Sequence, residues 1–113
     1  MGNFCKYEVI LVRYPFSDLS TAKVRPAVIV NAPHPSQDII ITPLTSKINS
    51  LLLGEFILTD WSGAGLNVAT AVKRGIYTVH ESLVIKAIGH LVELDLKQLD
   101  RSLETWLGLQ IED

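Results

Sequence analysis

The chain has 113 residues, 48% of them hydrophobic, and a formal net charge of −2. This length is typical of one domain, and we take residues 1–113 as a single domain. The apolar stretches are short and interrupted by charge or proline, which excludes a membrane-spanning helix, and the N-terminus has no pattern of a secretory signal. One cysteine, Cys5, excludes an internal disulfide, so a cytoplasmic location is expected.

The charge is unevenly distributed along the chain. Residues 1–92 contain 8 Lys+Arg and 6 Asp+Glu, a net of +2, whereas residues 93–113 contain 2 and 6, a net of −4. The acidic surplus therefore belongs to the C-terminal segment. The rest of the chain can present a basic face to a polyanion.

The pattern along most of the chain predicts short β-strands. Runs of β-branched and aromatic residues, bounded by proline, glycine or polar residues, indicate strands at 7–14, 24–30, 38–43, 55–58, 68–73, 76–80 and 88–93. Polar segments between them predict a loop at 15–24, a turn at 31–36 and a loop at 60–67. Residues 45–53 are ambiguous and have room for one helical turn.

The C-terminal segment has the periodicity of a helix. Apolar side chains recur there at three- and four-residue spacing, at Leu96, Leu99, Leu103, Trp106 and Leu107. Asp95, with Gln98 three residues later, is the expected N-cap, and Gly108 is the expected end. Many short strands followed by one packing helix indicate a mainly β fold, a small barrel whose helix covers an open side or edge.

Three segments form an ordered set of motifs. In residues 10–31 (ILVRYPFSDLSTAKVRPAVIVN), a strand leads through a Pro-Phe pair and a polar loop to an Arg-Pro-Ala strand. Residues 41–48 (ITPLTSKI) end a strand with Pro-x-Thr-Ser, and residues 65–91 run from a Gly-Leu loop to an Ile-Gly-x-Leu strand. In this order and at this spacing, the segments resemble the PemK/MazF toxins over nearly the whole chain.

The resemblance implies an SH3-like small barrel of the PemK/MazF/CcdB type and a homodimer. It also implies a toxin of a type II toxin–antitoxin pair. Such a toxin is a metal-independent endoribonuclease that cuts single-stranded RNA, such as mRNA, at short sequences. The implied partners are this RNA and a cognate antitoxin whose acidic tail covers the RNA groove and which binds DNA together with the toxin. No cofactor and no membrane are expected.

Metal-free RNA cleavage uses the neighbouring 2′-hydroxyl as the nucleophile, so the protein must bind the phosphate and stabilise its growing charge. The planar guanidinium of Arg25 can donate two hydrogen bonds to phosphate oxygens. Thr45 and Ser46 offer hydroxyls at the end of a strand. The resemblance assigns the catalytic roles to Arg25 and Thr45. Without it, Arg25 would be interpreted as part of a surface ion pair, and Thr45 and Ser46 as a helix cap.

The RNA path should be basic and should contain flat side chains on which bases stack. The candidate RNA-binding residues are Tyr14, Phe16, Ser17, Lys23, Ser46, Lys47, Lys73 and Arg74. Each lysine is equally compatible with a solvated surface charge, and Phe16 with an anchor of its loop in the core.

The third segment departs from part of the family. Some members have an Arg-x-Asp set there as acid and base, but the matching Ala71–Arg74 has no carboxylate. The position near the end of this segment that often has Asp is His80, which can titrate near neutral pH and is a candidate for proton transfer. A dimer contact or a turn is the simpler role for His80. The three histidines have no ligand spacing, so no metal site is predicted.

Two alternatives remain beside the ribonuclease. One is a gyrase poison of the CcdB type, which has a related fold and cleaves nothing. The other is a decayed toxin that binds its antitoxin without catalysis. The Arg-Pro and Pro-x-Thr-Ser signatures favour the ribonuclease, whereas the missing carboxylate keeps the decayed toxin open.

Overall fold

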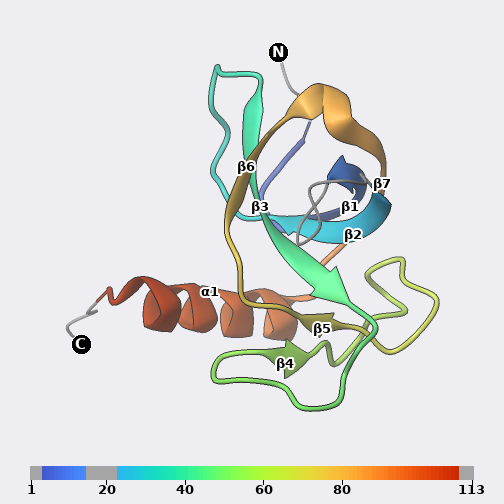
Figure 1. Cartoon of the computed structure of the whole chain (residues 1–113), viewed down its shortest axis with the longest axis vertical. Helices are drawn as coiled ribbons and strands as arrows, with labels where there is room; N and C mark the ends of the chain where they lie inside the picture. The colour runs from blue at the N-terminus through green and yellow to red at the C-terminus, as the bar shows by residue number, and fades with distance from the viewer. Residues whose placement is uncertain (1–3, 15–22, 110–113) are drawn as a thin grey trace.

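A computed structural model describes residues 4–14 and 23–109 (Figure 1). Its elements are β1 (Glu8–Tyr14), β2 (Lys23–Ile29), β3 (Asp38–Thr45), β4 (Phe56–Ile57), β5 (Ala71–Val72), β6 (Tyr77–His80), the 3-10 helix η1 (Glu81–Leu83), β7 (Val84–His90) and α1 (Glu93–Leu107). The expected fold class is confirmed, because the described part is mainly β and ends in an α-helix. None of its helices is long and apolar enough to cross a membrane.

The seven strands form one antiparallel sheet. Its order is β4-β5-β3-β2-β1-β7, and β6 pairs with β3 outside this path. The first half of β3 pairs with β6, and its last two residues pair with β5. The sheet curves into a barrel-like shape without closing, and α1 lies below it beside β5 (Figure 1).

Two hydrophobic clusters fill the two faces of the central strands. Alternate residues of a strand point to opposite faces, so neighbours in the sequence belong to different clusters. The outer cluster includes Val9 and Val28 and packs against Leu99 of α1. The inner cluster includes Ile10 and Ala27 and fills the interior of the barrel. Because both faces are covered, β1, β2 and β3 have nearly continuous apolar sequences.

The strand bounds differ from the prediction where local turns compete with pairing. The strand predicted at 68–73 is reduced to Ala71–Val72. The chain bends before it, and the Oγ1 of Thr70 donates to the carbonyl of Val68. The last strand begins at Val84 instead of 88 and ends at His90. Residues 46–53 contain no helical turn.

The helix α1 begins before the predicted cap. Val92 is its N-cap, and Asp95 lies inside the first turn, so the prediction of Asp95 as N-cap is wrong. The buried Asp95 carboxylate instead accepts hydrogen bonds from the backbone N–H and the hydroxyl of Thr59, both at 2.9 Å, and from the N–H of Asp60 at 3.2 Å. Gly108 ends the helix as predicted, with a left-handed φ of 68°.

Candidate functional site

Arg25 and Thr45 lie at the same end of two neighbouring strands. β2 and β3 are antiparallel, and Ala27 opposite Pro43 is their last pair at this end. Arg25 and Thr45 each lie two residues beyond that pair, so both belong to the sheet face of Ala27 and Pro43. The structure therefore brings the two predicted catalytic residues to one end of the barrel.

The hydroxyl of Thr45 is positioned by a local turn. Thr45 is half-buried, and its Oγ1 accepts a hydrogen bond from the backbone N–H of Lys47 at 3.0 Å. A hydroxyl that accepts in this way still has its own hydrogen to donate. No helix follows Thr45 directly, so interpreting Thr45 and Ser46 as a helix cap is wrong. Thr45 can therefore donate a hydrogen bond to an anionic oxygen from a fixed position.

Arg25 is exposed on β2, opposite the buried Val12 of β1. Within residues 4–14 and 23–109, the salt bridge of the structure joins Lys97 to Glu93 on α1 and does not involve Arg25. The interpretation of Arg25 as part of a surface ion pair therefore has no support in this part of the chain. Its guanidinium is available to an anion from outside.

Two tyrosines lie next to each other at one end of the inner cluster. Tyr14 and Tyr77 have ring centroids 5.5 Å apart and ring planes inclined by 59°. Tyr14 is opposite Lys23 of β2, and Tyr77 is opposite Ile41 of β3. Tyr77 was not predicted as a site residue, although its alternation with Val79 places both on one face of a strand. The pair adds aromatic surface on the same face as Arg25.

Lys73 and Arg74 point to different faces. The N–H of Lys73 donates to the carbonyl of Pro43 at 2.9 Å and continues the pairing of β5 with β3, so Lys73 shares a face with Thr45. Arg74 lies on the opposite face, where it lines a depression of about 230 Å³ with Trp106. Of the two, only Lys73 shares the face of Thr45.

A carboxylate that sequence reasoning missed lies beside this basic segment. Glu55 accepts hydrogen bonds from the backbone N–H of Arg74 at 2.9 Å and of Leu52 at 2.8 Å. Burial raises the pKa of Glu55, but these bonds and the charges of Lys73 and Arg74 outweigh it, so its pKa is below the ordinary value. Glu55 thus stays ionised and positions the chain at Arg74.

His80 lies away from this end of the barrel. It is opposite Asp38, seven residues along β3 from Thr45, which corresponds to about 23 Å in an extended strand. Its Nδ1 accepts a hydrogen bond from the N–H of Ser82 at 3.1 Å, and its Nε2 is 3.0 Å from Oε1 of Gln37. His80 therefore caps η1, and one subunit alone gives no support for proton transfer at Thr45.

The remaining candidates divide into two groups. Lys23, Ser46 and Lys47 are exposed, Lys23 at the start of β2 and the other two in the turn after Thr45. Phe16 and Ser17 lie outside the described residues. The part of the chain that the structure describes has no group of three or more His, Cys, Asp or Glu side chains that could hold a metal ion.

The chain matches a known protein family over most of its length. A family model described as "PemK-like, MazF-like toxin of type II toxin-antitoxin system" matches residues 6–107. The chain belongs to this family. This match confirms the resemblance to PemK/MazF toxins that the three motifs indicated. The roles of the individual residues of this MazF-like toxin remain predictions. A comparison with curated proteins gives no match.

Solved structures share the fold of this MazF-like toxin. An endoribonuclease from a mycobacterial species is 17% identical with a TM-score of 0.75, over 99% of this chain and 98% of that one. An endoribonuclease in complex with its cognate antitoxin, also mycobacterial, is 15% identical with a TM-score of 0.76, over 96% and 99%. The Mycobacterium tuberculosis toxin MazF-mt6 is 19% identical with a TM-score of 0.72, over 92% and 99%.

Proposed function

We propose that this MazF-like toxin is an endoribonuclease that cuts single-stranded RNA by attack of a 2′-hydroxyl on the adjacent phosphate, without a metal ion. The proposal rests mainly on one observation, the common position of Arg25 and Thr45 at the end of β2 and β3. Family membership supports it, and two of the similar structures are endoribonucleases.

Arg25 and Thr45 have complementary roles in this reaction. The guanidinium of Arg25 donates to two phosphate oxygens and stabilises the negative charge that grows as the 2′-oxygen attacks. Thr45 donates one further hydrogen bond and fixes the phosphate. Because the pKa of a guanidinium is above about 12, Arg25 does not act as a general base, and the protons are exchanged with water.

The face around Arg25 is suited to a single strand of RNA. Lys23 and Lys73 add positive charge on the face of Arg25 and Thr45, and Tyr14 and Tyr77 add aromatic surface. Single-strand-binding proteins combine these two features, a basic path and aromatic groups for base stacking. Ser46 and Lys47 extend the path along the turn after Thr45.

The proposal includes a cognate antitoxin, a homodimer and a cytoplasmic location. A similar toxin has been solved with its antitoxin, and an acidic tail complements the basic face of Lys23, Arg25 and Lys73. The antitoxin would then compete with RNA for this face. Exposed apolar side chains, such as Leu53 at 81% and Leu52 at 69%, favour burial against a second subunit.

The test is the cleavage of a long single-stranded RNA in EDTA by protein free of antitoxin. We compare the wild type with Arg25→Ala and with Arg101→Ala, a matched control because Arg101 is exposed on α1. We expect discrete cuts by the wild type and the control, and at least about a hundredfold loss in Arg25→Ala. Intact RNA with folded wild-type protein would contradict the proposal and favour the binding-only alternatives.

A further inference from the structure

A depression at the far end of the barrel takes no part in the proposed ribonuclease. It has a volume of about 350 Å³ and lies at the loop of residues 31–38, which projects from the end of the barrel opposite α1 and β5 (Figure 1). Most of its walls are apolar or rigid and are formed by Phe4, Ile29, Pro33, Pro35 and Ile39. It is therefore a preformed hollow that is separate from Arg25 and Thr45.

Two carboxylates line this depression. Asp38 begins β3 and Glu81 begins η1, and the N–H of Glu81 donates to the carbonyl of Gln37 at 2.8 Å, so the two acids come from adjoining segments. The Oε2 atom of Glu81 is buried, and no hydrogen-bond donor reaches it within the described residues. A buried carboxylate oxygen without a donor is destabilising, so a rotation of the Glu81 side chain that turns this oxygen toward a donor in the depression would be favourable.

The other polar groups of the depression are satisfied locally. Oδ1 of Asn31 accepts a hydrogen bond from the N–H of Ile40 at 2.9 Å, and Nδ1 of His34 accepts one from the N–H of Ser36 at 3.0 Å. No lysine or arginine is among the described residues that line the hollow. The negative charge of the two carboxylates therefore has no basic partner among these lining residues. A charge of this sign beside apolar walls suits a cation that is carried on an aliphatic side chain.

We propose that this depression binds an arginine side chain of a protein partner. A guanidinium has five N–H donors in a planar fork, enough to reach both Asp38 and Glu81, and its flat face can stack on the ring of Phe4. The aliphatic stem then packs on the prolines of the wall. A lysine ammonium is a point charge and matches two carboxylates less well.

The neighbouring surface favours a polypeptide over a free small cation. A second depression of about 250 Å³ adjoins the first and shares Asn31, His34, Ser36 and Asp38 with it. The surface can therefore hold residues next to the arginine as well as the arginine itself. This inference does not depend on ribonuclease activity, because the hollow lies at the other end of the barrel and none of its lining residues is a proposed catalytic or RNA-binding residue.

The test is a titration of ¹⁵N-labelled protein with the blocked tripeptide N-acetyl-Ala-Arg-Ala-amide. We expect saturable shifts of the amides of Ser36, Ile39 and Glu81. The same peptide with citrulline, which has the shape of arginine without its charge, should bind at least tenfold more weakly. Glu81→Gln should weaken binding of the arginine peptide by at least tenfold, and Glu93→Gln, an exposed control on α1, should leave it unchanged.

Glu81→Gln should fold normally, because its Oε2 has no hydrogen bond to lose within the described residues. An unchanged melting temperature checks this, and Asp38→Asn provides a second variant with the same expected loss of binding. Equal binding of the arginine and citrulline peptides, wild-type affinity in Glu81→Gln, or no shifts at millimolar peptide would overturn the proposal. Equal binding of free spermidine would overturn the assignment to a polypeptide.

Discussion

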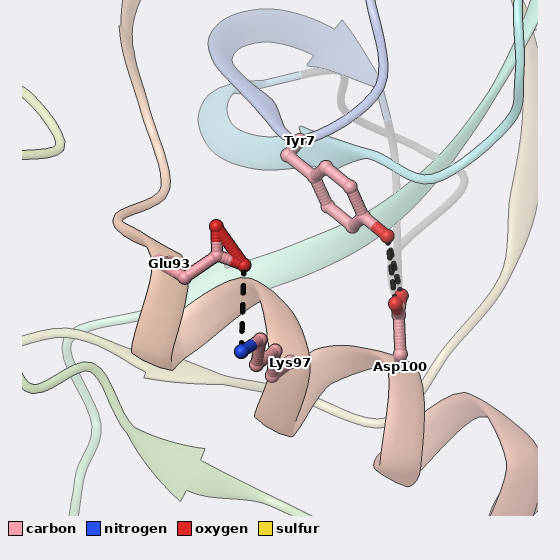
Figure 2. A network of polar contacts seen from close by, with 4 residues as sticks. All are labelled: Tyr7, Glu93, Lys97 and Asp100. Carbon is pink, nitrogen blue, oxygen red and sulfur yellow. Dashed lines mark hydrogen bonds and ion pairs between the residues drawn. The ribbon is translucent and has the colours of Figure 1, made fainter.

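At the scale of single residues, polar contacts join segments that are distant in the sequence. The hydroxyl of Tyr7 donates to the carboxylate of Asp100, at 2.8 and 2.7 Å from its two oxygens, and links the start of β1 to α1 (Figure 2). The nearby pair of Lys97 and Glu93, at 3.9 Å, lies within α1, is exposed and contributes little to stability. Of these two contacts, only that of Tyr7 with Asp100 connects the segment before β1 to the helix.

The substitution Tyr7→Phe tests the hydrogen bond of Tyr7 with Asp100 through the pH dependence of the free energy of unfolding. Burial and the hydrogen bond and charge of Asp100 raise the pKa of Tyr7 above 10.0, against a smaller opposing effect of Lys6. The folded state therefore favours the neutral phenol, a stabilisation that is complete below pH 10 and is lost as the pH rises through the raised pKa.

We expect Tyr7→Phe to lower the free energy of unfolding by about 1 kcal/mol at pH 8. Above pH 10 the difference from the wild type should shrink. Urea unfolding of both proteins at pH 8 and pH 11 measures it. A difference that is the same at both values would contradict the role of the phenol proton.

Asp95→Ala tests the buried carboxylate that was predicted as the helix N-cap and instead binds the loop at Thr59 and Asp60. Removal of its three hydrogen bonds leaves the donors of Thr59 and Asp60 unpaired, so we expect a loss of about 2–4 kcal/mol in the free energy of unfolding. Urea unfolding measures this loss as a lower midpoint at an unchanged slope. Glu93→Ala, exposed in the same helical turn, should stay within about 0.5 kcal/mol of the wild type. Equal effects of the two substitutions would be evidence that the hydrogen bonds of Asp95 do not stabilise the fold.

At the scale of elements, the sequence predicts what local patterns determine. The strands β1, β2 and β3 are long apolar runs because both their faces are covered, and the helix follows from its periodicity and Gly108. The strand at 68–73 was predicted too long, since the chain bends before Thr70, whose hydroxyl bonds to the carbonyl of Val68. No local pattern reveals that Asp95 bonds to a loop far from it in the sequence.

The sequence likewise predicted only part of the candidate site. Arg25 and Thr45 belong to motifs that the sequence displays, and the pairing of β2 with β3 explains why they lie at one end. Tyr77 and Glu55 were missed because their positions depend on contacts that pair distant segments. Arg74 was grouped with Lys73 because they are adjacent, yet alternation along the extended chain separates their side chains.

Two glycines with positive φ test the backbone geometry, Gly108 at the end of α1 and Gly65 in the loop between β4 and β5. Gly108 has a φ of 68° and no atom within 4 Å of an added Cβ, so Gly108→Ala should cost only the left-handed strain, about 1 kcal/mol. At Gly65, with a φ of 91°, an added Cβ would also collide with the carbonyl of Ile88. We expect Gly65→Ala to lose about 3 kcal/mol or more in thermal or urea unfolding. The reverse order would show that the loop and β7 are not in close contact.

At the scale of the whole molecule, charge of opposite sign gathers on different elements. Lys23, Arg25 and Lys73 share the face at one end of the barrel, whereas α1 has four acidic and two basic residues. A polyanion is therefore attracted to one part of the surface and repelled from another. The salt dependence of RNA binding should accordingly come from a small number of basic side chains on one face.

Lys73→Ala measures that dependence. Each phosphate contact to a single strand contributes about 0.7 to the slope of log K against log salt, so we expect the slope to fall by about 0.7 in magnitude. Fluorescence anisotropy with an uncleavable 2′-deoxy-substituted strand gives the affinities. Lys97→Ala, on α1, is the matched control and should keep the wild-type slope. An unchanged slope in Lys73→Ala would remove Lys73 from the RNA path.

The most direct test of the central claim concerns the nucleophile. Once the cleavage site is mapped, an oligonucleotide with one deoxynucleotide on the 5′ side of the scissile phosphate is incubated with the wild-type protein in EDTA. If the 2′-hydroxyl attacks the phosphate held by Arg25 and Thr45, the all-RNA strand is cut to a 2′,3′-cyclic phosphate and a 5′-hydroxyl, and the substituted strand stays intact. Cleavage of the substituted strand at the same bond would contradict the account.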